Sequence, residues 1–220
     1  MGNLFSVKQA CEQVGLNAII TNSKKTILAS SAVILPGVGA FGDAMQILEQ
    51  LDLVQVIQEL ANSGKPVAGI CLGMQLLMTE SHEFGRHRGL GLIEGEVTRL
   101  SVDTHLDRPL KVPHMGWSRI YSADSIDEQV PVGAWKGSLI EDLPNGTFMY
   151  FVHSYYPKPE SPDVRLSLTR YGSLEFCSSF QKRNIFGCQF HPERSGPRGL
   201  AIYRKLAASI HSLQEQHSYD

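Results

Sequence analysis

Short apolar runs alternate with amphipathic stretches along the first half of the chain. Apolar residues recur at helical spacing over residues 4–14 and 44–60, and both stretches are predicted to be helices. The short apolar runs at 17–21, 32–35 and 67–70 are predicted strands. Because strands that alternate with helices form parallel sheets, we expect an α/β fold in which helices flank a central, mostly parallel sheet.

The second half of the chain is richer in strand-like segments. Between them, residues 122–146 have weak periodicity, several acids and two prolines, so this stretch is predicted to be a surface loop. Residues 199–213 show the apolar stripe of a closing amphipathic helix. Closely spaced strands favour an antiparallel extension beside the parallel sheet. The predicted strands here cover residues 94–100, 111–121, 147–156, 164–170, 174–181 and 185–190.

Composition narrows the classes of function. A length of 220 residues suits one α/β domain over 1–220. A net charge of −2 and a pI near 6.4 give no basic surface for nucleic acid, and no apolar run is long enough to span a membrane. The four cysteines lack the paired spacing of a zinc site, and nothing resembles a signal peptide, so we expect a reducing, cytoplasmic setting.

The chain is organised around residues 65–79, which read KPVAGICLGMQLLMT. An apolar strand there runs into Gly-x-Cys-x-Gly, and a run suited to a helix, residues 74–78, follows. Glycines on both sides allow a sharp turn that presents Cys71 above the sheet, and the amides of the following helix favour its thiolate. Cys71 is therefore a candidate nucleophile. The alternative is a small buried cysteine with no chemical role.

A second glycine-rich segment, PGVGAFGDAM, follows the strand at 32–35. In alternating α/β folds such a loop lies at the carboxyl edge of the sheet, where ligands bind, and Cys71 belongs on the same edge. The spacing fits neither a dinucleotide fingerprint nor a P-loop. We expect an amide near Val38 to join the Leu72 N–H in binding an oxyanion, because acyl transfer needs fixed donors. A plain connecting turn is the alternative.

A base for this thiol follows the last strand, in the sequence His191-Pro192-Glu193. Imidazole titrates near neutral pH, so His191 can take the thiol proton and return it to a leaving amine. Glu193 can hold the other ring nitrogen and stabilise the imidazolium, while Pro192 stiffens the link. The alternative is a solvated histidine and acid at the end of a strand.

Other histidines carry weaker signals. His82 and His87 lie in a loop rich in arginine and glycine, and their spacing fits no helical metal-binding pair with a nearby acid, so we expect a solvated loop and no metal. His114 and Trp117, in KVPHMGWSRIY, could face a ligand or a partner. Such residues are more often ordinary packing residues.

Together, PGVGAFGDAM, GICLGMQLL and QFHPE resemble the class I (triad) glutamine amidotransferase family, in the order found there. VPHMGW and YFVHSYY are more specifically similar to the glutaminase subunits of imidazole glycerol phosphate synthases. The likeness covers most of the chain. It implies the flavodoxin-like fold of class I glutamine amidotransferases.

The resemblance assigns roles to particular residues. Cys71 attacks the side-chain amide of L-glutamine, His191 shuttles the proton and Glu193 orients His191. Gly37, Val38 and Gly39 match the family's oxyanion segment, with Leu72 N–H as second donor. The remaining matches are Gln75, His153, Ser154 and Tyr155 for glutamine binding, and Trp117 and Arg194 for the partner interface.

In this family the released ammonia passes into a synthase or cyclase barrel subunit, so the resemblance implies a heterodimer. That barrel joins ammonia to a phosphorylated ribosyl-aminoimidazole precursor, which yields imidazole glycerol phosphate and AICAR in histidine biosynthesis. The resemblance implies no cofactor and no metal.

Three departures from the family pattern keep alternatives open. Met1 stands directly at MGNL, where the family has a strand, so we expect a gap in the sheet through truncation, a misassigned start or replacement by another segment. Ser118 replaces a frequent asparagine, and Arg194 replaces a frequent lysine, so the interface ion pair is expected to differ. Three segments look more like paralogues from surface-polysaccharide biosynthesis than like the histidine-pathway form: GLGLIEGEVTRL, EFCSSFQ and IFGCQFHPERSGP. Those paralogues supply ammonia to a sugar-amidating synthase.

Two further functions remain as alternatives. A non-catalytic binding subunit would keep the triad while the missing strand disables the site. A cysteine peptidase or other hydrolase would share the nucleophile. This last possibility lacks support from PGVGAF and YFVHSYY.

Overall fold

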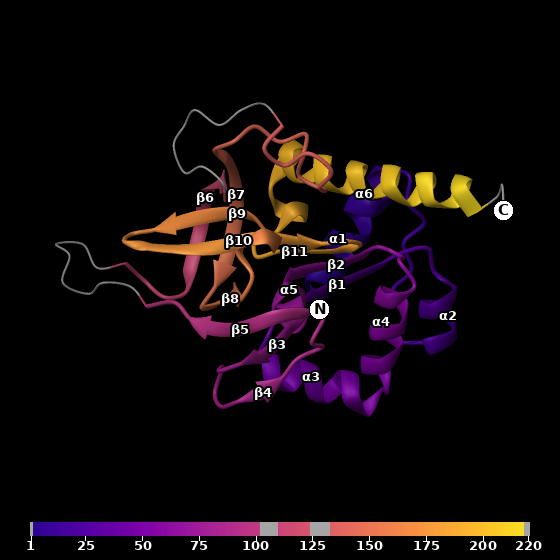
Figure 1. The fold of residues 1–220 in the computed structure, drawn as a ribbon, viewed down its shortest axis with the longest axis horizontal. Helices are drawn as coiled ribbons and strands as arrows, with labels where there is room; N and C mark the ends of the chain where they lie inside the picture. The colour runs from indigo at the N-terminus through magenta and orange to yellow at the C-terminus, as the bar shows by residue number, and fades with distance from the viewer. Residues whose placement is uncertain (1, 102–109, 124–132, 218–220) are drawn as a thin grey trace.

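A seven-stranded sheet forms the centre of the computed structural model, which describes residues 2–101, 110–123 and 133–217 (Figure 1). Its strand order is β1-β2-β11-β10-β9-β6-β7. The parallel part consists of β1 (Val33–Gly37), β2 (Val67–Cys71) and β11 (Ile185–Cys188). The antiparallel part consists of β10 (Leu174–Lys182), β9 (Arg165–Tyr171), β6 (His114–Ser122) and β7 (Thr147–His153). The predicted α/β fold, with a parallel core and an antiparallel extension, is confirmed.

Helices pack on both faces of the parallel strands. Apolar side chains of α1 (Gly2–Gln13) and α6 (Gly196–His217) pack with Ala68 and Ile70 of β2 in one core cluster. A second cluster joins the other side of the sheet to α2, α3 and α4. These three helices cover Lys24–Ala29, Phe41–Gln50 and Leu53–Asn62. None of the described helices is long and apolar enough to cross a membrane.

A smaller sheet lies beside the antiparallel part, with strand order β4-β3-β5-β8 (Figure 1). It begins where the short helix α5 (Leu72–Leu76) ends, earlier than predicted, because the carbonyls of Leu76 and Leu77 accept hydrogen bonds from the N–H groups of residues 90, 92 and 93. The chain therefore enters a strand at Met78. The strands are β3 (Met78–Ser81), β4 (His87–Arg88), β5 (Ile93–Arg99) and β8 (Tyr155–Pro159).

Three of the sequence predictions need correction. Residues 17–21 form no strand, because no described strand pairs with them, and Ile19 and Ile20 are 64% and 55% exposed. The helix predicted over 44–60 is two helices, because the backbone at Asp52 is left-handed (φ 50°, ψ 38°). The strand predicted over 147–156 breaks at Ser154, and its second half joins the smaller sheet.

The loop predicted over 122–146 is only partly at the surface. Residues 124–132 lie outside the described part of the structure. Trp135, Ile140 and Leu143 are buried in the core, and the Trp135 indole N–H donates to the carbonyl of Leu166 at 2.7 Å. Segments without regular periodicity can thus contribute buried apolar side chains to the core, which hydrophobic periodicity does not predict.

Strand β1 is an edge of the large sheet. Within the described residues it pairs only with β2, and all five of its residues are half-buried, whereas all five residues of β2 are buried. An edge strand leaves one row of backbone groups without ladder partners.

Candidate active site

Cys71 stands at the sharp turn between β2 and α5, as predicted. Its backbone angles are φ 55° and ψ −110°, in a region that non-glycine residues rarely adopt. The flanking glycines permit this turn by close backbone packing. A Cβ at Gly69 would lie 2.7 Å from the backbone of Gly73, and a Cβ at Gly73 would lie 1.6 Å from the carbonyl oxygen of Leu35. Gly69 and Gly73 are therefore required because a larger residue at either position would clash with neighbouring backbone.

The predicted oxyanion segment reaches the same turn. Gly37 ends β1 in register with Cys71, and a Cβ at Gly37 would lie 3.1 Å from the Cβ of Leu72. Gly39 has a φ of 113°, which favours glycine, and the Val38 side chain is exposed. The structure thus brings Gly37 beside Cys71 and Leu72. The oxyanion role of this segment stays a prediction.

His191 and Glu193 form a buried pair beside the cysteine. The His191 Nδ1 to Glu193 Oε1 distance is 2.8 Å, and their side chains are 2% and 0% exposed. Burial alone would lower the pKa of His191, but hydrogen bonds to Cys71 and Glu193 outweigh burial and raise this pKa to about 9. Because a carboxylate accepts from Nδ1, the Nε2 atom is left to serve the thiol.

Strand β7 holds the backbone of His191 in place. Its N–H donates to the Tyr150 carbonyl at 2.8 Å, where the short helix η2 (Pro192–Arg194) begins. The Ser195 hydroxyl donates to the His191 carbonyl at 2.7 Å and accepts from the Tyr150 N–H at 3.0 Å. Ser195 was not predicted as a site residue, since nothing in its local sequence shows that it spans these two elements.

The side chains of Gln75 and Gln189 form a hydrogen-bonded series from the Tyr155 carbonyl to the Cys71 thiol. The Gln75 amide nitrogen donates to the Tyr155 carbonyl at 2.9 Å and to Gln189 Oε1 at 3.0 Å. The Gln189 amide nitrogen in turn lies 3.6 Å from Cys71 Sγ. Gln189 was missed as a site residue, although it stands within the QFHPE motif. Gln75 was predicted to hold glutamine, and its amide nitrogen is engaged with protein partners.

The predicted glutamine-binding segment faces the site through its backbone. The Cys71 thiol donates to the Val152 carbonyl at 3.7 Å, and Gln75 contacts the Tyr155 carbonyl. The His153 ring is buried, with its Nδ1 2.9 Å from the Tyr155 carbonyl, while Ser154 and Tyr155 are half-buried. Of this segment, the Tyr155 carbonyl contacts Gln75, whereas the carbonyl bonded to Cys71 belongs to the preceding Val152. Glutamine binding by the segment stays a prediction.

The other three thiols lack this environment. Burial raises the pKa of Cys11 to about 11 and that of Cys177 to about 12, and it raises the pKa of Cys188 well above its usual value. These groups stay protonated near neutral pH. Among the described cysteines, Cys71 alone combines a strained turn with an imidazole–carboxylate pair.

The outer face of β6 and β7 carries the two residues predicted to meet a partner. Trp117 is 55% exposed and its ring centroid lies 5.9 Å from that of Tyr150. The Arg194 guanidinium lies over the same tyrosine ring, 4.6 Å from its centroid. Met115 and Phe148 on this face are also exposed. A groove of about 510 Å³ runs alongside, lined in part by Trp117 and Phe148. We call Met115, Trp117, Phe148, Tyr150 and Arg194 the outer face.

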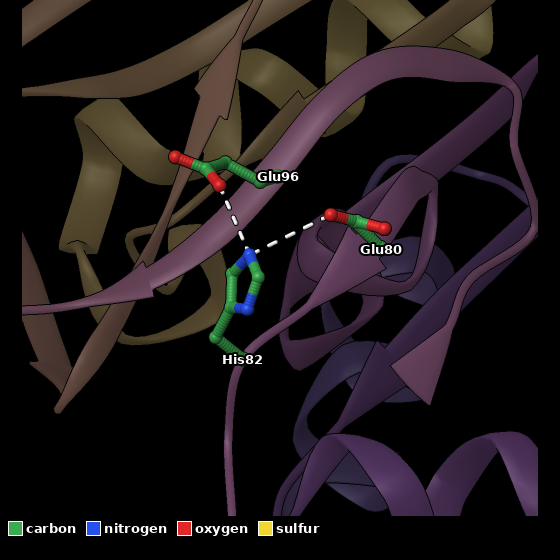
Figure 2. A group of neighbouring side chains, drawn as sticks. All are labelled: Glu80, His82 and Glu96. Atoms are coloured by element: carbon green, nitrogen blue, oxygen red, sulfur yellow. Dashed lines mark hydrogen bonds and ion pairs between the residues drawn. The ribbon is translucent and has the colours of Figure 1, made fainter. Parts of the chain in front are cut away.

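A separate polar cluster involves His82. Figure 2 shows its Nε2 between two carboxylates, 3.0 Å from Glu96 Oε2 and 3.6 Å from Glu80 Oε1. Their ligand atoms lie within 4.8 Å of one another, a set that could hold a metal ion. His82 is exposed, as expected for a solvated loop, and β3 and β5 place Glu80 and Glu96 opposite each other beside it, in parallel register.

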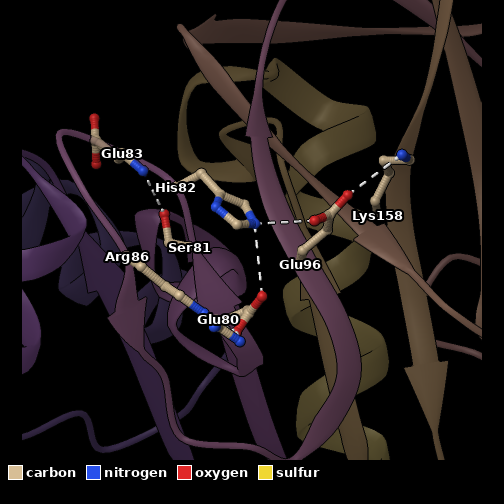
Figure 3. Close-up of polar contacts among 7 residues, drawn as sticks. All are labelled: Glu80, Ser81, His82, Glu83, Arg86, Glu96 and Lys158. Carbon is tan, nitrogen blue, oxygen red and sulfur yellow. Dashed lines mark hydrogen bonds and ion pairs between the residues drawn. The ribbon is translucent and has the colours of Figure 1, made fainter.

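Both carboxylates in this cluster already have cationic partners. Arg86 donates to Glu80 Oε2 at 2.7 Å, and the Lys158 ammonium lies 3.3 Å from Glu96 Oε1 (Figure 3). Burial raises the pKa of Glu96, but the hydrogen bonds to Lys158 and His82 outweigh it and lower this pKa overall. His82 is 45% exposed. A metal ion would compete with these ion pairs, so the cluster supports an ion-pair network between strands.

Comparisons with known proteins agree with the site. Residues 3–208 match the family model "Glutamine amidotransferase class-I". The "Imidazole glycerol phosphate synthase subunit HisH" of Moorella thermoacetica is 45% identical over 210 residues, covering 96% of this chain and 91% of that protein. The protein of the same name from Aquifex aeolicus is 42% identical over 214 residues, covering 97% and 95%.

Solved structures show the same fold at low identity. A structure described as "Crystal structure of glutamine amidotransferase" has a TM-score of 0.66 at 18% identity and covers 94% of this chain and 95% of that one. A putative GMP synthase protein from Thermoplasma acidophilum has a TM-score of 0.63 at 18% identity, covering 98% and 92%. From the family match and the full-length relatives, the chain belongs to the class I glutamine amidotransferases.

Proposed function

We propose that this chain is the glutaminase subunit of an imidazole glycerol phosphate synthase. It hydrolyses L-glutamine to glutamate and ammonia and delivers the ammonia to a synthase or cyclase barrel subunit. The observation that carries this proposal is the strained Cys71 beside the buried His191–Glu193 pair. The relatives named HisH, at 42–45% identity, support the choice of complex.

The site geometry supports a cysteine-thioester route. The Cys71 thiolate attacks the carbonyl carbon of the glutamine side chain, and backbone N–H groups near Val38 and Leu72 stabilise the oxyanion. His191 then gives its Nε2 proton to the leaving nitrogen, the C–N bond of the tetrahedral adduct breaks, and ammonia leaves the glutamyl thioester on Cys71. Next, His191 takes a proton from water, whose oxygen attacks the thioester, so that glutamate and the thiol are released. Glu193 keeps Nδ1 occupied throughout, which fixes the working nitrogen.

The outer face is the proposed docking surface for the barrel subunit. Exposed Met115, Trp117 and Phe148 give an apolar centre, and Arg194 over Tyr150 supplies a cation at its rim. The backbone of the same tyrosine is hydrogen-bonded to His191 and Ser195, so this surface lies close to the site that releases ammonia. The four cysteines are free thiols, which supports a reducing cytoplasm as the location.

Replacing the nucleophile tests the division of labour. In the complex with its barrel subunit, Cys71→Ala is expected to abolish glutamate release and glutamine-dependent synthesis, while added ammonium still supports synthesis. The matched control is Cys11→Ala, which removes a buried thiol on α1 and is expected to retain both activities.

Three outcomes would contradict different parts of the proposal. Glutamate release that survives Cys71→Ala would contradict the proposed nucleophile. A wild-type complex that uses ammonium but releases no glutamate would favour a non-catalytic binding subunit. Synthesis from an N-acetyl sugar, with none from the phosphorylated ribosyl-aminoimidazole precursor, would assign the chain to a sugar-amidating complex.

A further inference from the structure

Three side chains form a hydrogen-bonded series from β6 to the glutaminase site. The Ser118 hydroxyl lies 2.9 Å from His114 Nε2. His114 Nδ1 lies 3.1 Å from His153 Nε2, and His153 Nδ1 lies 2.9 Å from the Tyr155 carbonyl. We call these three side chains, with the Tyr155 carbonyl at their end, the histidine relay. The proposed reaction uses neither imidazole as acid or base.

The chemistry of the last acceptor fixes the direction of every bond. A carbonyl can only accept, so His153 must carry its proton on Nδ1. Burial lowers the pKa of His153 to about 3 and that of His114 to about 4, so both rings are neutral near pH 7. A neutral His153 accepts at Nε2, which requires His114 to donate from Nδ1. His114 then accepts at Nε2, and Ser118 donates.

Aromatic packing holds both imidazoles in this arrangement. The His114 ring is stacked 5.0 Å from Phe151 and lies 4.2 Å from the ring of Tyr171, measured between centroids. The His153 ring lies 5.0 Å from that of Phe176. Such contacts restrict ring flips, so the hydrogen bonds and the tautomers reinforce each other.

The far end of the histidine relay is the carbonyl that also accepts from Gln75. Gln75 bonds Gln189, whose amide nitrogen lies 3.6 Å from Cys71 Sγ. The orientation of the Tyr155 carbonyl therefore affects Gln75 and, through Gln75, the Gln189 side chain that lies against the nucleophile. Ser118, at the other end, stands next to Trp117 of the outer face and is half-buried.

We propose that His114 and His153 are positioning residues, which act as neutral Nδ1–H imidazoles and orient the Tyr155 carbonyl, and through it Gln75 and Gln189, for glutamine turnover at Cys71. This inference rests on the proposed glutaminase function. It adds that the pocket depends on a hydroxyl at the start of the relay, on the strand that carries Trp117.

The tautomers can be measured directly. In protein labelled with ¹⁵N-histidine, long-range ¹H–¹⁵N spectra distinguish Nδ1–H, Nε2–H and doubly protonated rings, and His114→Asn and His153→Asn assign the two signals. We expect both rings to be Nδ1–H tautomers and to stay neutral from pH 8 down to about pH 5. An Nε2–H tautomer at either residue, or protonation of either ring above pH 6, would overturn the proposal. This measurement needs neither glutamine nor a partner.

Kinetics of the complex test the positioning role. Ser118→Ala removes the first donor of the histidine relay, and we expect kcat/KM for glutamine to fall about three- to tenfold, the effect of one neutral hydrogen bond. The control Ser209→Ala removes a hydroxyl that donates to Leu206 on α6 and should leave kcat/KM unchanged. Equal kcat/KM for Ser118→Ala and wild type would contradict the proposal.

A conservative replacement separates positioning from packing. His153→Asn keeps an amide N–H near the Nδ1 position and is expected to retain more of kcat/KM than His153→Leu, which fills the space but leaves the Tyr155 carbonyl without its donor. Equal losses in two folded variants would assign His153 a packing role only. If the wild-type complex hydrolyses no glutamine, the proposed function itself fails, and the NMR spectra still decide the state of the histidine relay.

Discussion

His191 and Glu193 are fully enclosed, and this enclosure makes their protonation part of the folding equilibrium. The folded protein raises the pKa of His191 to about 9, whereas an unfolded histidine titrates near 6.5. Below pH 6.5 both states carry the proton, and the stabilisation is fully present. As pH rises through this window only the unfolded chain loses the proton, so stability falls until the folded pKa is passed.

The prediction at the scale of single residues concerns Glu193→Gln. Loss of the carboxylate charge removes one cause of the raised pKa, so the free energy of unfolding should fall less steeply between pH 6.5 and 9 than in wild type, where the slope approaches about 1 kcal/mol per pH unit. Urea unfolding at several pH values measures the slope. Glu175→Gln, at an exposed ion pair with Arg170, is the control, and wild-type steepness in Glu193→Gln would contradict the prediction.

The candidate catalytic residues could be identified from the sequence, whereas the residues that support them could not. Cys71 and His191 are indicated by the flanking glycines and by the neighbouring acid. Ser195 and Gln189 matter because distant segments meet: Ser195 bonds a residue 45 positions away, and Gln189 a residue 118 positions away. Local sequence patterns do not predict contacts between residues so far apart in the chain.

At the scale of elements, periodicity predicted the type of most helices and strands, but element boundaries, and the fate of residues 17–21, depended on tertiary contacts. The helix after Cys71 is short because residues 90–93 compete for its carbonyls. Residues 17–21 have the composition of a strand but no described neighbour to pair with, and a lone strand is unstable in water. The break at Asp52 interrupts an apolar stripe that continues through both helices, so periodicity alone could not reveal it.

This break gives a prediction for Asp52. Its left-handed backbone is tolerated by aspartate and glycine better than by alanine, so Asp52→Ala should lower the free energy of unfolding by about 1 kcal/mol, and Asp52→Gly should not. Both changes remove the exposed ion pair with Lys24, and Lys24→Ala measures that part separately. Equal denaturation midpoints for the alanine and glycine variants would show that backbone strain is not the cause.

At the scale of the whole molecule, β6 and β7 carry the proposed docking surface on one face and the histidine relay on the other. Alternation along β6 and β7 sends His114 and His153 inward and Trp117 outward, in one register that pairs Trp117 with Tyr150. The family resemblance suggested Trp117 for the interface and His153 for the pocket, but only the strand pairing shows that the proposed docking surface and the histidine relay share the same two strands.

The outer face yields the prediction at this scale. Trp117→Ala should reduce the affinity for the barrel subunit by a factor of about ten or more, because a large exposed aromatic ring at the centre of an apolar patch is a typical hot spot. Calorimetry or sedimentation of the mixed subunits measures this. Ile47→Ala removes an equally exposed apolar side chain on α3 and should leave affinity unchanged. Wild-type affinity for Trp117→Ala would place the interface elsewhere.

The open edge of β1 has a practical consequence for the isolated chain. The outer backbone row of this edge strand has no ladder partner among the described residues, and exposed Ile19 and Ile20 belong to the irregular segment between α1 and α2. Such an edge can template intermolecular strand pairing, which leads to aggregation as protein concentration or temperature rises. The chain is therefore best purified at low concentration, and a solubilising lysine near Ile19 is a rational first change for crystallisation.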